Sequence, residues 1–429
     1  MRDNCPGFED CRTGRPFAPA VPGMKLPMAI VLGVDTPVGL TVVRELGRRG
    51  VPVHGIGRNG DALGRTSRYL AGFSVRPQGP SLAQWLPERL FHTGGRALFA
   101  IAEDDLVDLA ALPEDIEGCR ILTPRKPQLD LVLDKSRTLA LAAGLGMDVP
   151  ESWQPVAGEN FTQYADTLSY PVVAKWADPP AMTRILDEHR LALVKAEHAA
   201  SPAALLALLQ RYAPLREWPM VQPYCPGYGF AQMLHMSGGE PTLTFQHRRI
   251  HEWPAEGGFS TLCESIPLRR HAHQMERSAG LLAAIGWEGP AMVEYRHDPK
   301  TGKYWLMEVN GRFWGSLPLA LHCGAEFAWE QYRHRILGES GRAKPRLVNR
   351  RARFLVPETR RLLSVLFRAR SIPNFRPSRL ADLVSYITGF FDPRLRHFIY
   401  AKDDPRPYFQ DIWGIIHRLV KREKRPEDL

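Results

Sequence analysis

The hydrophobic positions near the start of this chain follow the pattern of buried parallel strands that alternate with helices. Residues 28–34, MAIVLGV, form an unbroken apolar run, which is typical of a strand buried on both faces of a sheet. Apolar residues at helical spacing follow, and Gly50 ends that helix. The runs VPVHGIG and ALFAIAEDDLVDLAAL then repeat strand and helix. Residues 28–125 are therefore predicted to form a Rossmann-like α/β domain.

The pattern changes after residue 125 to helices mixed with hairpins. The segment YPVVAKWAD, residues 170–178, predicts a strand that carries Lys175 near its end. Residues 231–253 and 290–310 each predict two strands joined by a turn, at Gly-Gly in the first and at DPKTGK in the second. Residues 126–340 are therefore predicted to form an α+β body.

The second predicted hairpin carries polar residues where an apolar face would be ordinary. Glu308, Asn310 and Arg312 occupy every second position of one strand, so they share one face. Glu294 lies in the partner strand, and the turn brings it toward them. Carboxylate and amide oxygens suit Mg²⁺, and a guanidinium binds phosphate through two hydrogen bonds. A ladder of surface salt bridges is the structural alternative.

Two lysines precede this hairpin along the chain. Lys135 opens a predicted helix, and Lys175 ends an apolar strand. Either can place its charge on a phosphate, although each taken alone also fits an ordinary solvated lysine. Residues 222–225 then form a junction of strand and loop, QPYC. The order is two cations, a hinge, three candidate metal ligands and Arg312.

In this order of motifs, residues 28–340 resemble the ATP-grasp enzymes, most of all the large-chain type of carbamoyl phosphate synthetase. That family also has a metal ligand 14 positions before a Glu-x-Asn-x-Arg strand. The resemblance implies that the two lysines contact the phosphates of ATP and that Arg312 faces the transferred phosphoryl group. It implies an adenine hinge formed by Gln222, Pro223, Tyr224 and Cys225. It also implies a site for Mg²⁺ or Mn²⁺ formed by Glu294, Glu308 and Asn310.

Two segments differ from the usual pattern of that family. A glycine-rich loop commonly follows the strand lysine, but WADPPAMTRILDEHR contains no glycine, and residues 182–184 are the expected flap. An acidic residue commonly follows the hinge near the ribose, but GYGFAQ contains none.

Residues 245–261, FQHRRIHEWPAEGGFST, combine cations with a Gly-Gly turn. Similar stretches in the resembled family lie beside the carboxylate or acyl phosphate. Glycines let a backbone approach a ligand closely, and a serine adds a donor. Because successive residues of a strand face opposite sides, the arginine beside the substrate is either Arg248 or Arg249. The structural alternative is a basic hairpin edge followed by a plain turn. The expected substrate residues are Arg248, Gly257, Gly258 and Ser260, and Arg248 is expected to act in the reaction with Lys175 and Arg312.

Positive charge is concentrated at the C-terminal end. The chain has a net charge of +10, whereas residues 341–429 contain 21 lysines and arginines against 9 acidic residues, a net charge of +12. Residues 341–429 are predicted to form a mostly helical C-terminal extension with two basic amphipathic stretches, 358–370 and 408–424. They either dock on the body, which buries Trp413 and Ile416, or contact an anionic membrane surface.

The expected function is an ATP-grasp ligase that joins a carboxylate to an amine. The alternative is a catalytically degenerate scaffold that binds nucleotide or lies on a membrane surface. A nucleic-acid partner is not favoured, because basic and aromatic residues do not interleave, and a homodimer is left open. Residues 1–27 predict a disordered tail without a signal-peptide core. The six cysteines contain no CxxC pair, which favours a reducing, cytoplasmic location.

Overall fold

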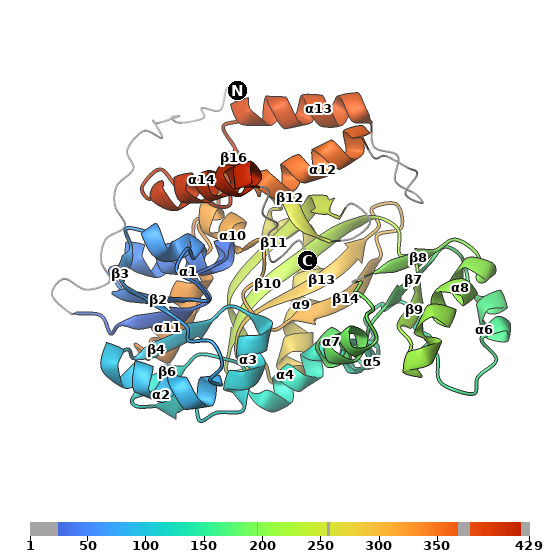
Figure 1. Ribbon diagram of the computed structural model, residues 1–429, viewed down its shortest axis with the longest axis horizontal. Helices are drawn as coiled ribbons and strands as arrows, with labels where there is room; N and C mark the ends of the chain where they lie inside the picture. The colour runs from blue at the N-terminus through green and yellow to red at the C-terminus, as the bar shows by residue number, and fades with distance from the viewer. Residues whose placement is uncertain (1–24, 195, 255–257, 368–377, 422–429) are drawn as a thin grey trace, which may run out of the picture.

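The computed structural model describes residues 25–194, 196–254, 258–367 and 378–421. These residues form three β-sheets with helices on their faces, a mixed α/β architecture (Figure 1). Most of the predicted N-terminal tail lies outside the described residues. Within the described ranges, no helix is both long enough and apolar enough to cross a membrane.

The first sheet lies at the lower left of Figure 1 and has the strand order β3-β2-β1-β4-β6-β5. Its neighbouring strands run parallel, except that β5 is antiparallel to β6. The strands are β1 (Ala29–Leu32), β2 (Val53–Gly57), β3 (Leu70–Val75), β4 (Ala97–Ala100), β5 (Asp115–Ile116) and β6 (Cys119–Ile121). The accompanying helices are α1 (Pro37–Arg48), η1 (Leu63–Thr66), α2 (Leu82–Thr93) and α3 (Glu103–Ala110).

A small antiparallel sheet forms a separate lobe at the right of Figure 1. Its strand order is β8-β7-β9, and it has its own apolar cluster with the helices of the lobe. The elements are β7 (Val172–Lys175), β8 (Glu197–Ala199), β9 (Met220–Pro223), α6 (Phe161–Thr167), α7 (Pro179–Glu188), α8 (Pro202–Tyr212) and η2 (Ala213–Leu215). Helices α4 (Lys126–Leu133) and α5 (Lys135–Gly144) precede this lobe.

The expected flap at residues 182–184 lies inside helix α7. Asp178 accepts a hydrogen bond from the Ala181 amide, and a proline occupies the first turn. Both features favour a helix start. The segment after Lys175 is therefore a capped helix rather than an open loop.

The central sheet has seven strands in the order β14-β13-β10-β11-β12-β15-β16. The two predicted hairpins are confirmed as the antiparallel pairs β10–β11 and β13–β14. The strands are β10 (Tyr228–Ser237), β11 (Glu240–Trp253), β12 (Phe259–Ser265), β13 (Gly289–His297), β14 (Tyr304–Asn310), β15 (Arg351–Arg353) and β16 (Leu395–His397). The associated helices are η3 (Leu268–His271), α9 (Ala272–Ile285), α10 (Leu317–Cys323) and α11 (Phe327–Arg335).

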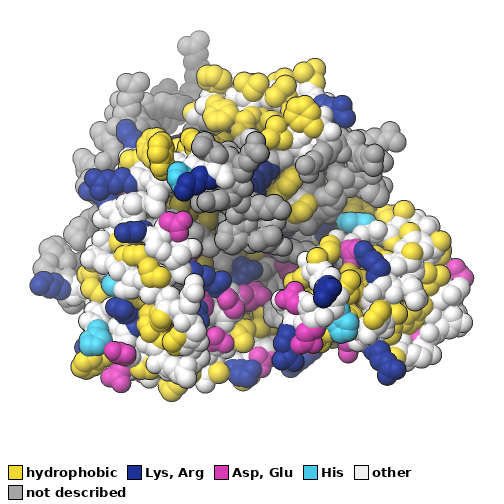
Figure 2. All heavy atoms as spheres, viewed as in Figure 1, with side chains coloured by type: hydrophobic (Ala, Val, Ile, Leu, Met, Phe, Trp, Pro, Cys, Tyr) yellow, Lys and Arg dark blue, Asp and Glu magenta, His cyan; other side chains and the backbone are white. Residues whose placement is uncertain are grey.

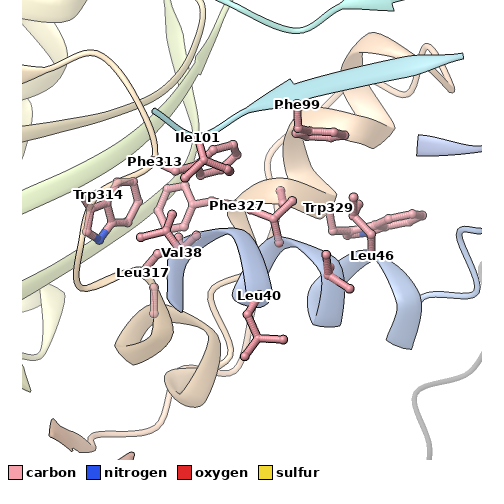
Figure 3. Close-up of a cluster of buried hydrophobic side chains, with 14 of the residues drawn as sticks. Val38, Leu40, Leu46, Phe99, Ile101, Phe313, Trp314, Leu317, Phe327 and Trp329 are labelled. Atoms are coloured by element: carbon pink, nitrogen blue, oxygen red, sulfur yellow. The ribbon is translucent and has the colours of Figure 1, made fainter. Parts of the chain in front are cut away.

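A buried apolar cluster joins the central sheet to the first one directly after β14. Figure 3 shows Phe313 and Trp314 packed among side chains from α1, β4 and α11. Trp314 is fully buried, and the rings of Phe99 and Phe313 lie 6.3 Å apart. This cluster holds the backbone immediately after Arg312, so it fixes the end of the polar strand.

The C-terminal segment contributes strands β15 and β16 to the central sheet, and three helices above it. These are α12 (Leu355–Phe367), α13 (Arg379–Thr388) with the short η4 (Gly389–Phe391), and α14 (Arg406–Lys421). Helix α14 packs on the body through Tyr408, Ile412 lines a small pocket beside it, and Gln410 accepts a hydrogen bond from Thr66 at 2.7 Å.

The expectation that docking buries Trp413 and Ile416 is wrong. Their exposed fractions are 69% and 49%, so neither side chain is covered by the described residues of the body. The apolar residues of this helix form one broad stripe, of which Tyr408 packs on the core while Phe409, Trp413 and Ile416 stay exposed. The side chains of Leu419 and Val420 lie outside the described residues.

We therefore expect Trp413→Ala to leave the melting temperature within about 2 °C of the parent, since an exposed side chain loses little packing on truncation. Trp287→Ala is the matched control, because Trp287 is 1% exposed and its loss would leave a cavity. Differential scanning fluorimetry of both variants checks this. A marked fall for Trp413→Ala would contradict the exposed position.

Candidate active site

Two carboxylates and an amide meet on the strand pair at the edge of the central sheet. The antiparallel register places Glu294 of β13 directly opposite Glu308 of β14. The Asn310 side-chain amide donates to Glu294 Oε1 and to Glu308 Oε1, each at 3.1 Å. The convergence that alternation predicted for these three residues is thus present.

Cations flank both carboxylates. Lys135, the first residue of α5, places Nζ 3.3 Å from Glu308 Oε2. Arg249 of β11 forms an ion pair with Glu294, and its guanidinium also lies 3.5 Å from Glu252. Two facing carboxylates repel each other, and the positive charges of Lys135 and Arg249 offset this repulsion.

The two carboxyl groups have opposite pKa shifts. Burial raises the pKa of Glu294, and repulsion from Glu308 adds to that increase against the attraction of Arg249. Burial also acts to raise the pKa of Glu308, but Lys135, the Asn310 hydrogen bond and Arg249 outweigh it and lower that pKa well below its usual range. Glu308 is therefore firmly ionised at neutral pH.

Lys175 lies behind this pair at the end of β7. Its Nζ is 3.9 Å from Met307 Sδ, and Lys175 forms no ion pair with a carboxylate of the described residues. Burial lowers the pKa of Lys175 and the nearby Lys135 lowers it further, while Glu308 favours the charged form. An anion that entered here would gain from this incompletely neutralised charge.

The hinge residues continue from β9, which is antiparallel to β7. Gln222 is buried, and its side-chain amide donates to Ser152 Oγ at 2.8 Å. Pro223 ends the strand. Arg296 of β13 donates to the Cys225 carbonyl and to the Tyr224 hydroxyl, each at 3.2 Å. Sequence reasoning missed Arg296, which lies two residues after Glu294 in the predicted strand.

Arg312 connects this site to the first sheet. Its Nε donates to Glu103 Oε2 at 3.1 Å, and Glu103 begins α3. Gly311, directly before it, has no room for a side chain, since an added Cβ would lie 2.3 Å from the Trp287 ring. Glu103 was not predicted, because nothing in the linear pattern connects it with a residue 209 positions away.

The parity of β11 separates Arg249 from Arg248. Arg248 lies on the opposite face, where it forms an ion pair with Glu264 at 2.7 Å and stands over the Tyr228 ring. The structure therefore does not bring Arg248 to the carboxylates, and Arg249, the alternative that parity left open, is the residue that lies there.

The other expected substrate residues lie on or before β12. Gly258 accepts a hydrogen bond from Arg249 at 3.4 Å through its carbonyl. Ser260 is 8% exposed, and its hydroxyl has no hydrogen-bond partner among the described residues. Gly257 lies outside the described residues. A buried hydroxyl without a partner is costly, so Ser260 is a candidate ligand donor.

The two neighbouring arginines provide a matched test of this geometry. We expect Arg249→Met to lower the free energy of unfolding by about 2 kcal/mol, because it leaves the Glu294 carboxylate without its cation in a mostly buried place. Arg248→Met should cost less than about 0.5 kcal/mol, because Arg248 is 44% exposed and Glu264 keeps Arg351 as a partner. Urea unfolding at neutral pH measures both, and equal losses would contradict the separation of the two faces.

Comparison with known proteins supports an assignment of the fold. No family model and no curated protein matches this chain. The biotin carboxylase domain of the Hydrogenobacter thermophilus 2-oxoglutarate carboxylase, in complex with MgADP and bicarbonate, is similar with a TM-score of 0.56 and 13% identity, over 74% of this chain and 71% of that one.

Two further solved structures are similar. N5-carboxyaminoimidazole synthetase from Staphylococcus aureus matches with a TM-score of 0.58 and 13% identity, over 80% of this chain and 87% of that one. The L-amino acid ligase from Bacillus licheniformis matches with a TM-score of 0.51 and 14% identity, over 73% and 75%. These proteins are ATP-grasp enzymes, and the chain described here has the ATP-grasp fold.

Proposed function

We propose that this protein is an ATP- and Mg²⁺-dependent ligase that joins a carboxylate to an amine and releases ADP and phosphate. The observation that carries the proposal is the facing pair Glu294 and Glu308, linked by the Asn310 amide and flanked by Lys135, Lys175 and Arg249. A magnesium nucleotide needs both kinds of group, since oxygen ligands bind the metal and cations bind the phosphates.

The donor set fits a divalent metal. One oxygen of each carboxylate accepts a hydrogen bond at 3.1 Å from the Asn310 amide nitrogen, so the two carboxylates converge. A small cation between them would gain from two negative charges, and Asn310 would bind it through the amide oxygen after a rotation of the amide. Among the described residues, no group of three or more acidic, histidine or cysteine side chains is arranged to hold a metal ion by itself. Mg²⁺ commonly completes its shell with substrate phosphates and water.

In this proposal Glu294, Glu308 and Asn310 hold Mg²⁺ or Mn²⁺, which would offset the charge that builds up on the transferred phosphoryl group. Lys135 and Lys175 bind the phosphates, and Arg312 faces the transferred group. Residues 222–225 bracket the adenine through their backbone groups. The protein then contributes mainly position and charge, as in phosphoryl transfer generally.

The reaction has two steps. A carboxylate oxygen of the acid attacks the γ-phosphorus of ATP and ADP leaves, which forms an acyl phosphate. The amine nitrogen then attacks the acyl carbon, phosphate leaves with the C–O bond electrons, and the nitrogen loses a proton. We propose that the acid binds at Arg249, Gly258 and Ser260. Arg249 pairs with Glu294 and donates to the Gly258 carbonyl, and the Ser260 hydroxyl has no hydrogen-bond partner among the described residues.

The bound molecules of two similar proteins support the choice of reaction. The thermophilic biotin carboxylase domain was solved with MgADP and bicarbonate, and the synthetase from Staphylococcus aureus was also solved with ADP. A nucleotide site and a small acid in one fold are what the proposed reaction requires.

An ADP-release screen of a carboxylate and amine library with ATP and Mg²⁺ tests the proposal. ADP release that requires an acid and an amine together is expected. The alternative is a scaffold that binds nucleotide without turnover, and it is favoured by the glycine-free helix α7 after Lys175. Thermal stabilisation by Mg-ATP without ADP release from any pair would establish that alternative and refute the ligase.

A further inference from the structure

The C-terminal helices expose an unusual number of large apolar side chains. Ten of them, each between 48% and 83% exposed, come from α12, α13, η4 and α14. We call this set the C-terminal apolar face: Leu363, Phe367, Leu380, Val384, Ile387, Phe390, Phe391, Phe409, Trp413 and Ile416. Figure 2 shows hydrophobic side chains gathered along the top of the molecule, where α13 lies in Figure 1. Apolar surface of this kind marks an interaction site.

Helix α13 is oriented opposite to an ordinary docked helix. It has no fully buried residue, and Leu380, Val384 and Ile387 form an i, i+4, i+7 stripe that is 50% to 72% exposed. Polar contacts attach its other side to the body. Asp382 binds Arg361 at 2.7 Å, and the hydroxyls of Tyr386 and Thr359 lie 2.6 Å apart.

Arg353 strengthens this attachment from below. Its guanidinium stacks over the rings of Tyr386 and Phe390, at 4.7 Å and 5.2 Å from their centroids, and donates to the Tyr386 carbonyl at 3.1 Å. Polar and cation–π contacts therefore hold α13 in place, and its apolar stripe is not used to complete the core of this chain.

Helix α14 repeats the arrangement. Phe409, Trp413 and Ile416 follow the same i, i+4, i+7 spacing, and all three are exposed. Tyr408 packs on the core of the body, and Ile412 lines a small pocket there. Aromatic and aliphatic residues on one face of a helix with basic residues beside them are typical of helices that lie in a membrane interface.

The charges around this face point to the occupant. Among the described residues from 351 to 421, the exposed basic residues include Arg379, Arg394, Lys402, Arg406 and Lys421. The acidic residues of the same range are largely screened by partners: Glu358 and Asp404 are buried, Asp382 binds Arg361, and Asp403 binds Arg48. The described residues of this range contain 11 lysines and arginines against 6 acidic residues, so the segment that carries the apolar side chains has a net positive charge.

From these contacts we propose that the C-terminal apolar face docks this protein on an anionic lipid bilayer. A second copy of the chain is a poorer occupant, because a symmetric contact would bring the two basic surfaces together. An anionic bilayer satisfies both features at once, since acyl chains accept the apolar side chains and lipid headgroups neutralise the arginines and lysines.

Sedimentation with sucrose-loaded vesicles tests this. Full-length protein is mixed at 0.15 M salt with vesicles of phosphatidylcholine alone or of phosphatidylcholine and phosphatidylglycerol in equal parts. We expect binding to the anionic vesicles, weaker binding to the neutral ones, and a loss on raising the salt to about 0.5 M, where screening acts over a few ångströms.

A double variant, Leu380→Ser with Phe391→Ser, should weaken the partition onto anionic vesicles by about a hundredfold, because it removes two large apolar side chains from the face. The matched control is Phe91→Ser. Phe91 is 70% exposed on α2, which lies at the bottom of Figure 1, whereas α13 lies at the top. It should bind like the parent. The melting temperature of each variant verifies that the protein is folded.

Three results would overturn the proposal. The first is no sedimentation of the parent with anionic vesicles even at low salt. The second is binding that the double variant retains in full. The third is a parent protein that does not bind vesicles but forms a dimer in sedimentation velocity without lipid, when the double variant is a monomer. That result would assign the face to a second copy.

Discussion

Glu308→Gln is expected to lower the rate of ADP release about a thousandfold. The substitution keeps the size of the side chain and the Asn310 contact, but it removes the negative charge opposite Glu294. A metal held by one carboxylate fewer stabilises the transferred phosphoryl group less, and metals contribute several kcal/mol of such stabilisation. A thousandfold loss corresponds to about 4 kcal/mol. Steady-state ADP release with the acid and amine that the screen identifies measures it.

The variant should be less stable than the parent but still folded, since Glu308→Gln keeps the Asn310 hydrogen bond and leaves Lys135 without its ion-pair partner. Glu264→Gln is the control, because Glu264 also lies in the central sheet but pairs with Arg248 and Arg351 away from the site. It should retain parental turnover. If Glu308→Gln turned over ATP at the parental rate, Glu308 would not be a metal ligand.

Lys175→Met is expected to lower kcat/KM for ATP about a hundredfold, because a preorganised cation at a phosphate contributes in this range. The same variant should have an unchanged or higher melting temperature without nucleotide. Burial and the neighbouring Lys135 lower the pKa of Lys175, so the charge is unfavourable in the empty protein, and a methionine keeps the apolar stem without it. The stabilisation by saturating Mg-ATP should shrink.

These opposite effects on stability and on nucleotide binding separate a phosphate ligand from a structural lysine. Lys126→Met serves as the control, since Lys126 is exposed on α4 and pairs with Asp130. It should leave both quantities unchanged. A melting shift with Mg-ATP equal to that of the parent would remove Lys175 from the nucleotide site.

The local pattern was sufficient to predict the candidate site around β14. Alternation in a strand places Glu308 and Asn310 on one face whatever surrounds them, and a short turn brings Glu294 opposite. Both predicted hairpins are present for the same reason. These features depend on neighbours in the chain, so one sequence determines them.

Contacts between distant segments could not be predicted in this way. The choice of Arg249 over Arg248 depends on the register of β11, which contains irregularities where it pairs with β12. Arg296 reaches the hinge, and Glu103 reaches Arg312, across 71 and 209 positions of sequence. No periodicity connects residues that meet only when separate sheets pack.

The C-terminal helices show the same division most clearly. Their sequence determined that they are amphipathic, since hydrophobic spacing is a local property. Only the tertiary structure decided which way they face, because burial depends on what the rest of the chain leaves uncovered. The apolar stripe of helix α14 is wider than the area that the body covers, so Tyr408 packs on the core while Trp413 remains 69% exposed. For α13, Arg353 and Arg361 hold the polar side inward and leave the apolar stripe outside.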